Sequence, residues 1–205
     1  MSADAIFQIV ILIFSVVVHE VAHGYAAYLL GDHTAKYQGR LTLNPLKHLD
    51  PFGSVVLPLI LYISNAGFMI GWAKPVPFNP YNLKNQRWGE AIVAVAGPLS
   101  NIAIAVVFGF LLRIGFIFGF ANEQIIHITS YIVLINLVLA VFNLIPIPPL
   151  DGSKIVFSVF QISWGPTRVF LERFGIVLVL GFVYFFWPIV SPVIIHLFGF
   201  ITGLI

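Results

Sequence analysis

The segment from Ala5 to Leu30 is an apolar run that is long enough to cross a membrane. A helix rises about 1.5 Å per residue, so about 20 apolar residues span a hydrocarbon core of about 30 Å. His19, Glu20 and His23 interrupt this run in the pattern H-E-x-x-H. Because ionisable groups are costly at membrane depth, they mark functional sites by default. The segment therefore predicts a membrane helix that carries a polar site in its second half.

The spacing within this pattern indicates what the site binds. Residues four apart lie on one face of a helix, so His19 and His23 can bind a single metal ion. Glu20 is rotated by about 100° from His19, which leaves its carboxylate free to act as a base on a metal-polarised water. Chance H-E-x-x-H patterns on soluble helices expose their histidines to solvent. The apolar surroundings of this one favour a zinc site instead.

The composition extends the membrane assignment to the whole chain. Of 205 residues, 60% are hydrophobic and only 9% are charged, whereas typical soluble domains carry about 25% charged residues. We expect a single all-α, membrane-embedded domain over residues 1–205, surrounded by the lipid bilayer. The chain has no cysteine, which excludes thiolate zinc ligands, and its net charge of +2 gives no support for a nucleic-acid partner.

Further apolar runs predict the other membrane segments of a three-helix core. Residues 90–112 and 126–145 are continuous enough to form spanning helices, together with the first one at 5–30. Residues 51–71 are also apolar, but Pro58 makes a straight helix doubtful, since an interior proline costs about 3 kcal/mol. Between these segments, residues 40–44 alternate apolar and polar side chains, which favours a short strand.

The C-terminal third predicts additional helices. Residues 154–163 read as a short helical piece, and residues 170–187 form another apolar helix. We expect Pro188 and Pro192 to interrupt that helix. Residues 193–205 are short for a spanning helix of their own.

A zinc site with two histidines needs a third protein ligand. Asp151 is the strongest candidate, because it follows a proline-interrupted helix end where irregular backbone can turn a carboxylate toward a cavity. An ordinary Leu-Asp-Gly turn at the membrane surface is the alternative. His127 and His196 have no partner at ligand spacing and fit the membrane interface better.

This choice of ligand constrains the topology. Asp151 can reach the histidines only if the C-terminal ends of the first and third core helices share one side of the membrane. Residues 51–71 are therefore predicted to enter the membrane and return on the same side. Nine of the ten basic residues then lie on the side of the site and one on the other: Lys36, Arg40, Lys47, Lys74, Lys84, Arg87, Lys154, Arg168 and Arg173 against Arg113. Since cytoplasmic loops carry the Lys and Arg excess, we expect the site to face the cytoplasm from the cell membrane.

Three motifs in this order resemble the site-2 proteases, a family of membrane-embedded zinc metalloproteases. They are HEVAH at 19–23, GPLSN at 97–101 and NLIPIPPLDG at 143–152. The resemblance covers about residues 15–155, and RLTLNP at 40–45 and AKPVPFN at 73–79 are similar to the compact members. Larger members carry an extra helix, or a PDZ or nucleotide-sensing domain, and no such domain is expected here.

The resemblance also implies roles for individual residues. The zinc ligands would be His19, His23 and Asp151. The catalytic carboxylate would be Glu20. Asn143 would lie near the reacting carbonyl, although amide side chains also commonly tie membrane helices together. For Asn101 this structural role is the expected one.

The implied reaction is hydrolysis of peptide bonds in or next to the transmembrane helices of membrane-protein substrates. The alternative is a metal or proton transporter or channel in which His19, Glu20, His23 and Asp151 form the path. Such a path would need polar residues along several helices, and it would not explain a carboxylate at the position of the base. A scaffold that only binds helices is a third, less favoured interpretation.

Overall fold

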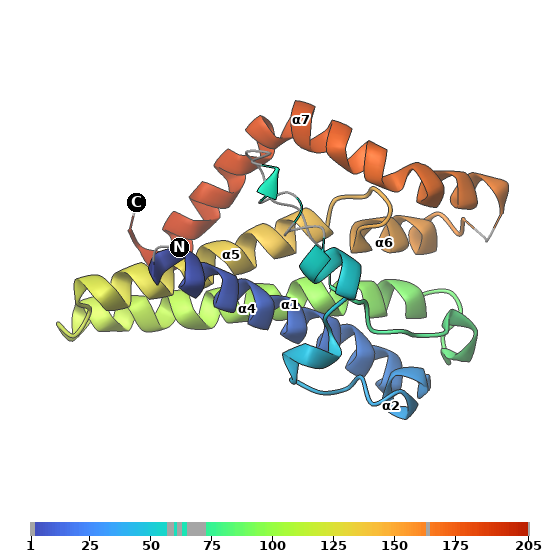
Figure 1. Ribbon diagram of the computed structural model, residues 1–205, viewed down its shortest axis with the longest axis horizontal. Coiled ribbons are helices and arrows are strands. Elements are labelled where there is room, and N and C mark those ends of the chain that lie inside the picture. Colours follow the sequence, from blue (N-terminus) through green and yellow to red (C-terminus); the bar gives the residue numbers. More distant parts are fainter. Residues whose placement is uncertain (1–2, 57–59, 61–62, 65–72, 163–164, 205) are drawn as a thin grey trace.

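The protein is a bundle of long helices in the computed structural model, which describes residues 3–56, 60, 63–64, 73–162 and 165–204 (Figure 1). No β-strand forms within these residues. Four of the described helices are long and apolar enough to cross a membrane: α1 (Ala3–Leu29), α4 (Gly89–Ile117), α5 (Glu123–Asn143) and α7 (Pro166–Thr202). The prediction of an all-α integral membrane protein is confirmed.

The first three of these helices pack side by side and form the predicted core (Figure 1). Their ends differ from the predicted boundaries by only a few residues. Most of the buried residues of α4 are small, among them Ala91, Ala94, Gly97, Ala105 and Gly109. Because lipid tails are as apolar as side chains, membrane helices associate through close backbone approach and van der Waals packing. The small residues of α4 allow its neighbours to approach closely.

Short helical turns connect the long helices at the end of the bundle where α1 ends and α4 begins. They are α2 (Thr34–Tyr37), η1 (Pro45–Lys47), η2 (Pro51–Val56), η3 (Pro80–Asn82) and α6 (Asp151–Val159). The predicted strand at 40–44 is wrong. The backbone N–H of Arg40 instead bonds to Ala35 and closes the turn after α2. The predicted re-entrant segment begins with η2, and its residues 57–59, 61–62 and 65–71 lie outside the described residues.

Asp32 joins the loop that follows α1 to the loop that precedes α4. Its carboxylate accepts hydrogen bonds from the backbone N–H of Asn79 (2.7 Å), the side-chain amide of Asn82 (2.8 Å) and the hydroxyl of Thr34 (2.6 Å). Burial alone would raise the pKa of Asp32, but these hydrogen bonds stabilise its charged form and hold the pKa below its ordinary value. Both loops therefore lie at the same end of the bundle, as the predicted topology requires.

The C-terminal apolar residues form one helix, α7, which continues through Pro188 and Pro192. The prediction that these prolines interrupt the helix is wrong. A helix that ended within lipid would leave backbone groups unpaired with no water to bind them. Bending costs less than ending, and Figure 1 shows a change of direction within α7. At its start, Arg168 forms ion pairs with Glu172 and with Glu90 in the first turn of α4.

Replacing Asp32 with Asn tests the connection between the two loops. The substitution turns one acceptor oxygen into an N–H group that faces another donor, so we expect the free energy of unfolding to fall by about 1–3 kcal/mol at pH 7. The pKa of Asp32 is lowered in the folded protein. Its stabilisation is therefore present above the ordinary pKa of an aspartate and is lost as the pH falls through the folded value.

Thermal unfolding of the detergent-solubilised protein measures this difference. The Asp32→Asn protein should melt at a lower temperature than the wild type at pH 7, and the two midpoints should approach each other below about pH 4. Asp4→Asn is the control, because the Asp4 side chain is 59% exposed. Equal midpoints for Asp32→Asn and the wild type at pH 7 would contradict the proposed connection.

Candidate metal centre

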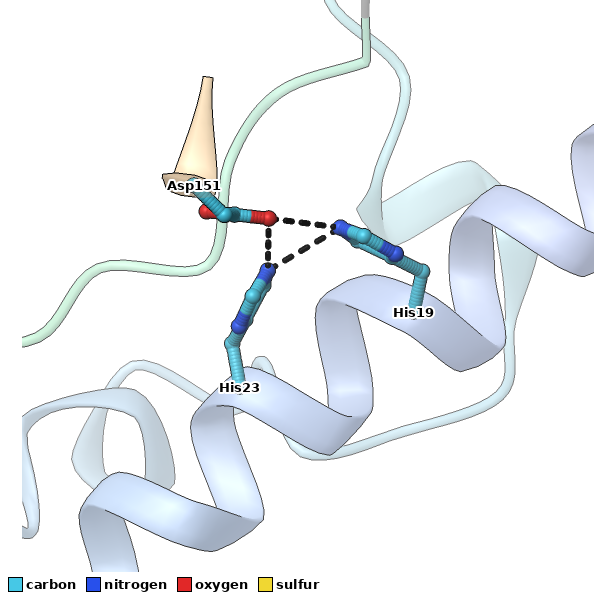
Figure 2. Close-up of side chains that lie close together, drawn as sticks. All are labelled: His19, His23 and Asp151. Atoms are coloured by element: carbon cyan, nitrogen blue, oxygen red, sulfur yellow. Dashed lines mark hydrogen bonds and ion pairs between the residues drawn. The ribbon is translucent and has the colours of Figure 1, made fainter. Parts of the chain in front are cut away.

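Three buried side chains from two distant parts of the chain converge on one point. Asp151 Oδ2 lies 3.1 Å from His19 Nε2 and 3.0 Å from His23 Nε2, and the two nitrogens are 3.0 Å apart (Figure 2). His19 and Asp151 are each 5% exposed, and His23 is 7% exposed. The structure thus brings together the three residues that the sequence predicts as ligands.

The hydrogen bonds behind the two imidazoles define which nitrogen faces the point of convergence. His19 Nδ1 lies 2.6 Å from Asn101 Oδ1, and His23 Nδ1 lies 2.7 Å from the carbonyl oxygen of Val93. Both partners are acceptors, so Nδ1 of each ring carries the proton and donates. Each Nε2 then presents a lone pair to the other nitrogen and to the carboxylate oxygen of Asp151.

Three lone pairs that face one another repel unless a cation lies among them. Ligand atoms about 2.0–2.1 Å from a tetrahedral zinc ion are about 3.3 Å from each other. The distances of 3.0–3.1 Å between these three atoms are close to that value. The donor set of two neutral imidazoles and one carboxylate therefore fits a zinc ion in both chemistry and spacing.

Asp151 reaches the histidines because the chain turns sharply between α5 and α6. It is the first residue of α6, and a Cβ atom on the following Gly152 would lie 2.2 Å from the carbonyl oxygen of Leu144. Only glycine allows the turn to close this tightly. The second carboxylate oxygen, Oδ1, binds the ammonium group of Lys154 at 3.0 Å. Asp151 is therefore held from both sides rather than exposed in a surface turn.

The backbone of α4 packs directly against the two imidazoles. A Cβ atom on Gly97 would lie 2.5 Å from Nε2 of His23 and 2.6 Å from Nε2 of His19. The first residue of the GPLSN motif must therefore be glycine for the two imidazoles to occupy these positions. The last residue of the same motif, Asn101, holds His19 from behind.

Glu20 is half-buried next to His19 in α1, and an extended segment of the loop before α4 contacts it. Its Oε2 accepts a hydrogen bond from the backbone N–H of Val76 at 2.8 Å. Arg40 holds this segment in turn by donating to the carbonyl oxygens of Lys74 (2.8 Å) and Pro75 (3.3 Å). Sequence reasoning missed both contacts. The proline spacing in AKPVPFN is a signal for an extended segment, but not for its partner.

The asparagines near the site make different contacts. Asn143 is the last residue of α5, and its side chain donates to the carbonyl oxygen of Leu139 in its own helix (3.0 Å). Among the described residues it makes no hydrogen bond to the three ligands or to Glu20. Asn101, expected to be structural only, contacts a ligand directly. Asn136, which the sequence analysis did not single out, binds Asn101.

His127 and His196 lie outside the site. The nearest acidic group to His127 is Asp4, at 3.9 Å and largely exposed. His196 is exposed and donates to Pro192 one turn earlier in α7. Neither belongs to the cluster of His19, His23 and Asp151.

Comparison with known proteins adds independent evidence. The chain is 39% identical over 196 residues to YwhC of Bacillus subtilis (strain 168), and the alignment covers 90% of this chain and 86% of YwhC. A family model described as peptidase family M50 matches residues 118–186. The chain belongs to peptidase family M50. The resemblance to the site-2 proteases is thereby confirmed.

Other M50 relatives match shorter parts of the chain. Rip2 of Mycolicibacterium smegmatis is 33% identical over 141 residues, which are 68% of this chain and 52% of Rip2. MJ0611 of Methanocaldococcus jannaschii is 42% identical over 75 residues, or 36% of this chain and 34% of MJ0611. All three relatives carry the name of a zinc metalloprotease. No solved structure matches the chain.

Gly97→Ala tests the close packing of α4 against the imidazoles. The added methyl group would lie well inside contact distance of both Nε2 atoms, so it must displace the ligands or the helix. We expect the purified protein to lose most of its bound zinc, as measured by elemental analysis. Gly181→Ala in α7 is the matched control, since nothing lies within 4 Å of its Cβ position. Wild-type zinc content in Gly97→Ala would disprove this arrangement of the site.

Proposed function

We propose that this member of peptidase family M50 is an intramembrane zinc metalloendopeptidase. It hydrolyses peptide bonds in or next to the transmembrane helices of other membrane proteins, in regulated intramembrane proteolysis. The observation that carries the proposal is the buried set of His19, His23 and Asp151 next to Glu20, within the apolar helix α1. The names of the M50 relatives support zinc as the ion.

The three ligands and Glu20 divide the chemistry between them. When bound, a zinc ion supplies Lewis acidity, which polarises a water molecule and the substrate carbonyl. Glu20 accepts the proton of the attacking water and transfers it to the leaving amine. The N–H of Val76 binds one oxygen of Glu20, so this hydrogen bond orients the carboxylate and leaves the other oxygen for the proton.

Asn143 is proposed to stabilise the developing oxyanion. It lies at the end of α5, at the start of the turn that leads to Asp151. An amide nitrogen carries two hydrogens, and the described hydrogen bond to Leu139 uses one of them. The second N–H can donate to a carbonyl oxygen on which negative charge develops.

The transporter alternative requires a polar path that continues through the bundle. Among the described residues, the buried polar side chains behind His19 belong to Ser15, Asn101 and Asn136. They bond to one another and to the backbone of α5 at Ile132. This local cluster favours a single isolated site over a path.

We further propose that residues 1–205 form one membrane-embedded unit in the cell membrane, with its site toward the cytoplasm. The long helices of the bundle leave large apolar side chains exposed, as contact with lipid tails requires. The basic residues other than Arg113 lie in the loops and short helices at the end of the bundle that holds the site, and at the start of α7. Arg113 lies at the other end, where it donates to the carbonyl oxygens of Phe200 and Ile201 in α7. This asymmetry follows the positive-inside rule.

Glu20→Gln separates catalysis from metal binding. The substitution keeps the size and polarity of the side chain but removes the base, so zinc should stay bound while proteolysis stops. Membrane-protein fragments in cells that express the wild type or the variant can be compared by quantitative mass spectrometry. Fragments of single-span proteins should be present only with the wild type, and the intact proteins should co-purify with Glu20→Gln. Equal fragment levels in both cell lines would refute the assigned base.

Single cysteines test the orientation, because the native chain contains none. Lys47 and Lys84 are exposed in the two loops at the site, whereas Gln124 is exposed at the opposite end of the bundle. A membrane-impermeant thiol reagent should label Gln124→Cys in intact cells. It should label Lys47→Cys and Lys84→Cys only after lysis. The reverse pattern would invert the proposed topology.

A further inference from the structure

A fully enclosed polar cluster lies behind His19, on the side away from the metal. Ser15 of α1, Asn101 of α4 and Asn136 of α5 are 4%, 0% and 0% exposed. Asn101 Nδ2 lies 2.8 Å from Asn136 Oδ1 and 3.3 Å from the carbonyl oxygen of Ser15. Asn136 Nδ2 lies 2.9 Å from the hydroxyl of Ser15 and 2.8 Å from the carbonyl oxygen of Ile132. Each of the three core helices thus contributes one side chain to the cluster.

These contacts determine the orientation of both amide groups. The carbonyl oxygen of Ile132 can only accept, so the Asn136 atom that faces it is the amide nitrogen. Oδ1 of Asn136 then faces Asn101 and accepts from its Nδ2. Oδ1 of Asn101 is left for His19, and it accepts the proton of Nδ1 at 2.6 Å. Reversing Asn136 would set its oxygen against the carbonyl oxygen of Ile132, and reversing Asn101 would set its oxygen against Oδ1 of Asn136; each pair consists of two acceptors.

The donor and acceptor directions in this chain of hydrogen bonds determine which nitrogen of His19 faces the metal centre. An imidazole that donates from Nδ1 carries its lone pair on Nε2, the atom that faces His23 and Asp151. Without the Asn136 acceptor, Nδ2 of Asn101 keeps only the longer contact to Ser15. The amide can then rotate and present N–H to the ring, which favours the tautomer that cannot bind the ion through Nε2.

We propose that Asn136 is a positioning residue for the metal ion. Acting through Asn101, it holds His19 in the tautomer and orientation that direct Nε2 at the ion. The inference rests on the metal centre of the proposed function but not on proteolysis. Ordinary interhelical hydrogen bonding would stabilise the bundle without any effect on metal affinity, and this difference can be measured.

A double-mutant cycle on metal affinity tests the proposal. The proteins are the wild type, Asn101→Leu, Asn136→Leu and the double variant, in which leucine replaces asparagine at similar volume. The zinc dissociation constant of each purified protein is measured by competition with a fluorescent chelator. Loss of a hydrogen bond behind a ligating histidine typically weakens metal binding about 10- to 100-fold. We expect about tenfold or more for each single variant.

The double variant distinguishes a relay from two independent effects. If Asn136 acts only through Asn101, the double variant should bind zinc no more weakly than Asn101→Leu alone. Additive losses would overturn the proposal, and so would wild-type affinity in Asn136→Leu. The melting temperatures of the metal-free proteins, compared with that of Thr202→Val, control for loosened packing. Thr202 is fully buried and bonds only within α7 and to Leu204, remote from the site.

A conservative variant keeps the test decisive if leucine at position 136 prevents folding. Asn136→Asp retains the oxygen that accepts from Asn101, and when protonated its O–H replaces the amide donor. Zinc affinity close to that of the wild type is expected, and an affinity as low as that of Asn101→Leu would refute the relay. Because cleavage is not measured, a protein that binds zinc through this relay but cuts no substrate would refute the proposed function alone.

Discussion

The convergence of His19, His23 and Asp151 inside a membrane bundle is the constraint on which the rest of the structure depends. A buried carboxylate costs several kcal/mol unless it is paired, and here it faces two imidazole lone pairs. A bound cation removes that repulsion, and Lys154 supports the charge of Asp151 from the other side. The charge and the lone pairs of the site thus fit a bound cation. Its ligands come from two parts of the chain that must be held in register by the helices between them.

α4 meets this requirement through its small residues. It packs between α1 and α5, and where its surface meets the two imidazoles Gly97 has no side chain. One turn later, Asn101 supplies an acceptor for Nδ1 of His19. The GPLSN motif therefore combines two functions in five residues, namely room for the ligands and an acceptor behind one of them.

The loops at the same end extend this organisation to Glu20. Asp32 ties the loop before α4 to the end of α1, and Arg40 holds the carbonyl groups of its extended segment. The result is a single backbone N–H, that of Val76, directed at Glu20. Prolines on both sides of Val76 have no N–H of their own. The segment therefore offers Glu20 one donor and leaves the rest of the carboxylate available.

Local features of the sequence determined the membrane helices and the placement of the two histidines on one helix face. The length of each apolar run sets a membrane helix, and the four-residue spacing sets two imidazoles on one face, because both depend only on helix geometry. Asp151 followed from the need for a third ligand and from the family motif. The strand at 40–44 and the interruption of α7 were wrong, since alternation and proline are weak signals where lipid and loop contacts compete with them.

Only the tertiary structure decided what lies behind the ligands. Asn136 is 35 residues from Asn101 along the chain, and Val76 is 56 residues from Glu20. The sequence contains no repeat that relates positions so far apart. A polar residue in an apolar helix also looks the same in the sequence whether it bonds to another helix or to a ligand. Their partners depend on how three helices rotate against one another. That rotation is set by packing of small residues across the bundle, which is a property of the folded chain as a whole.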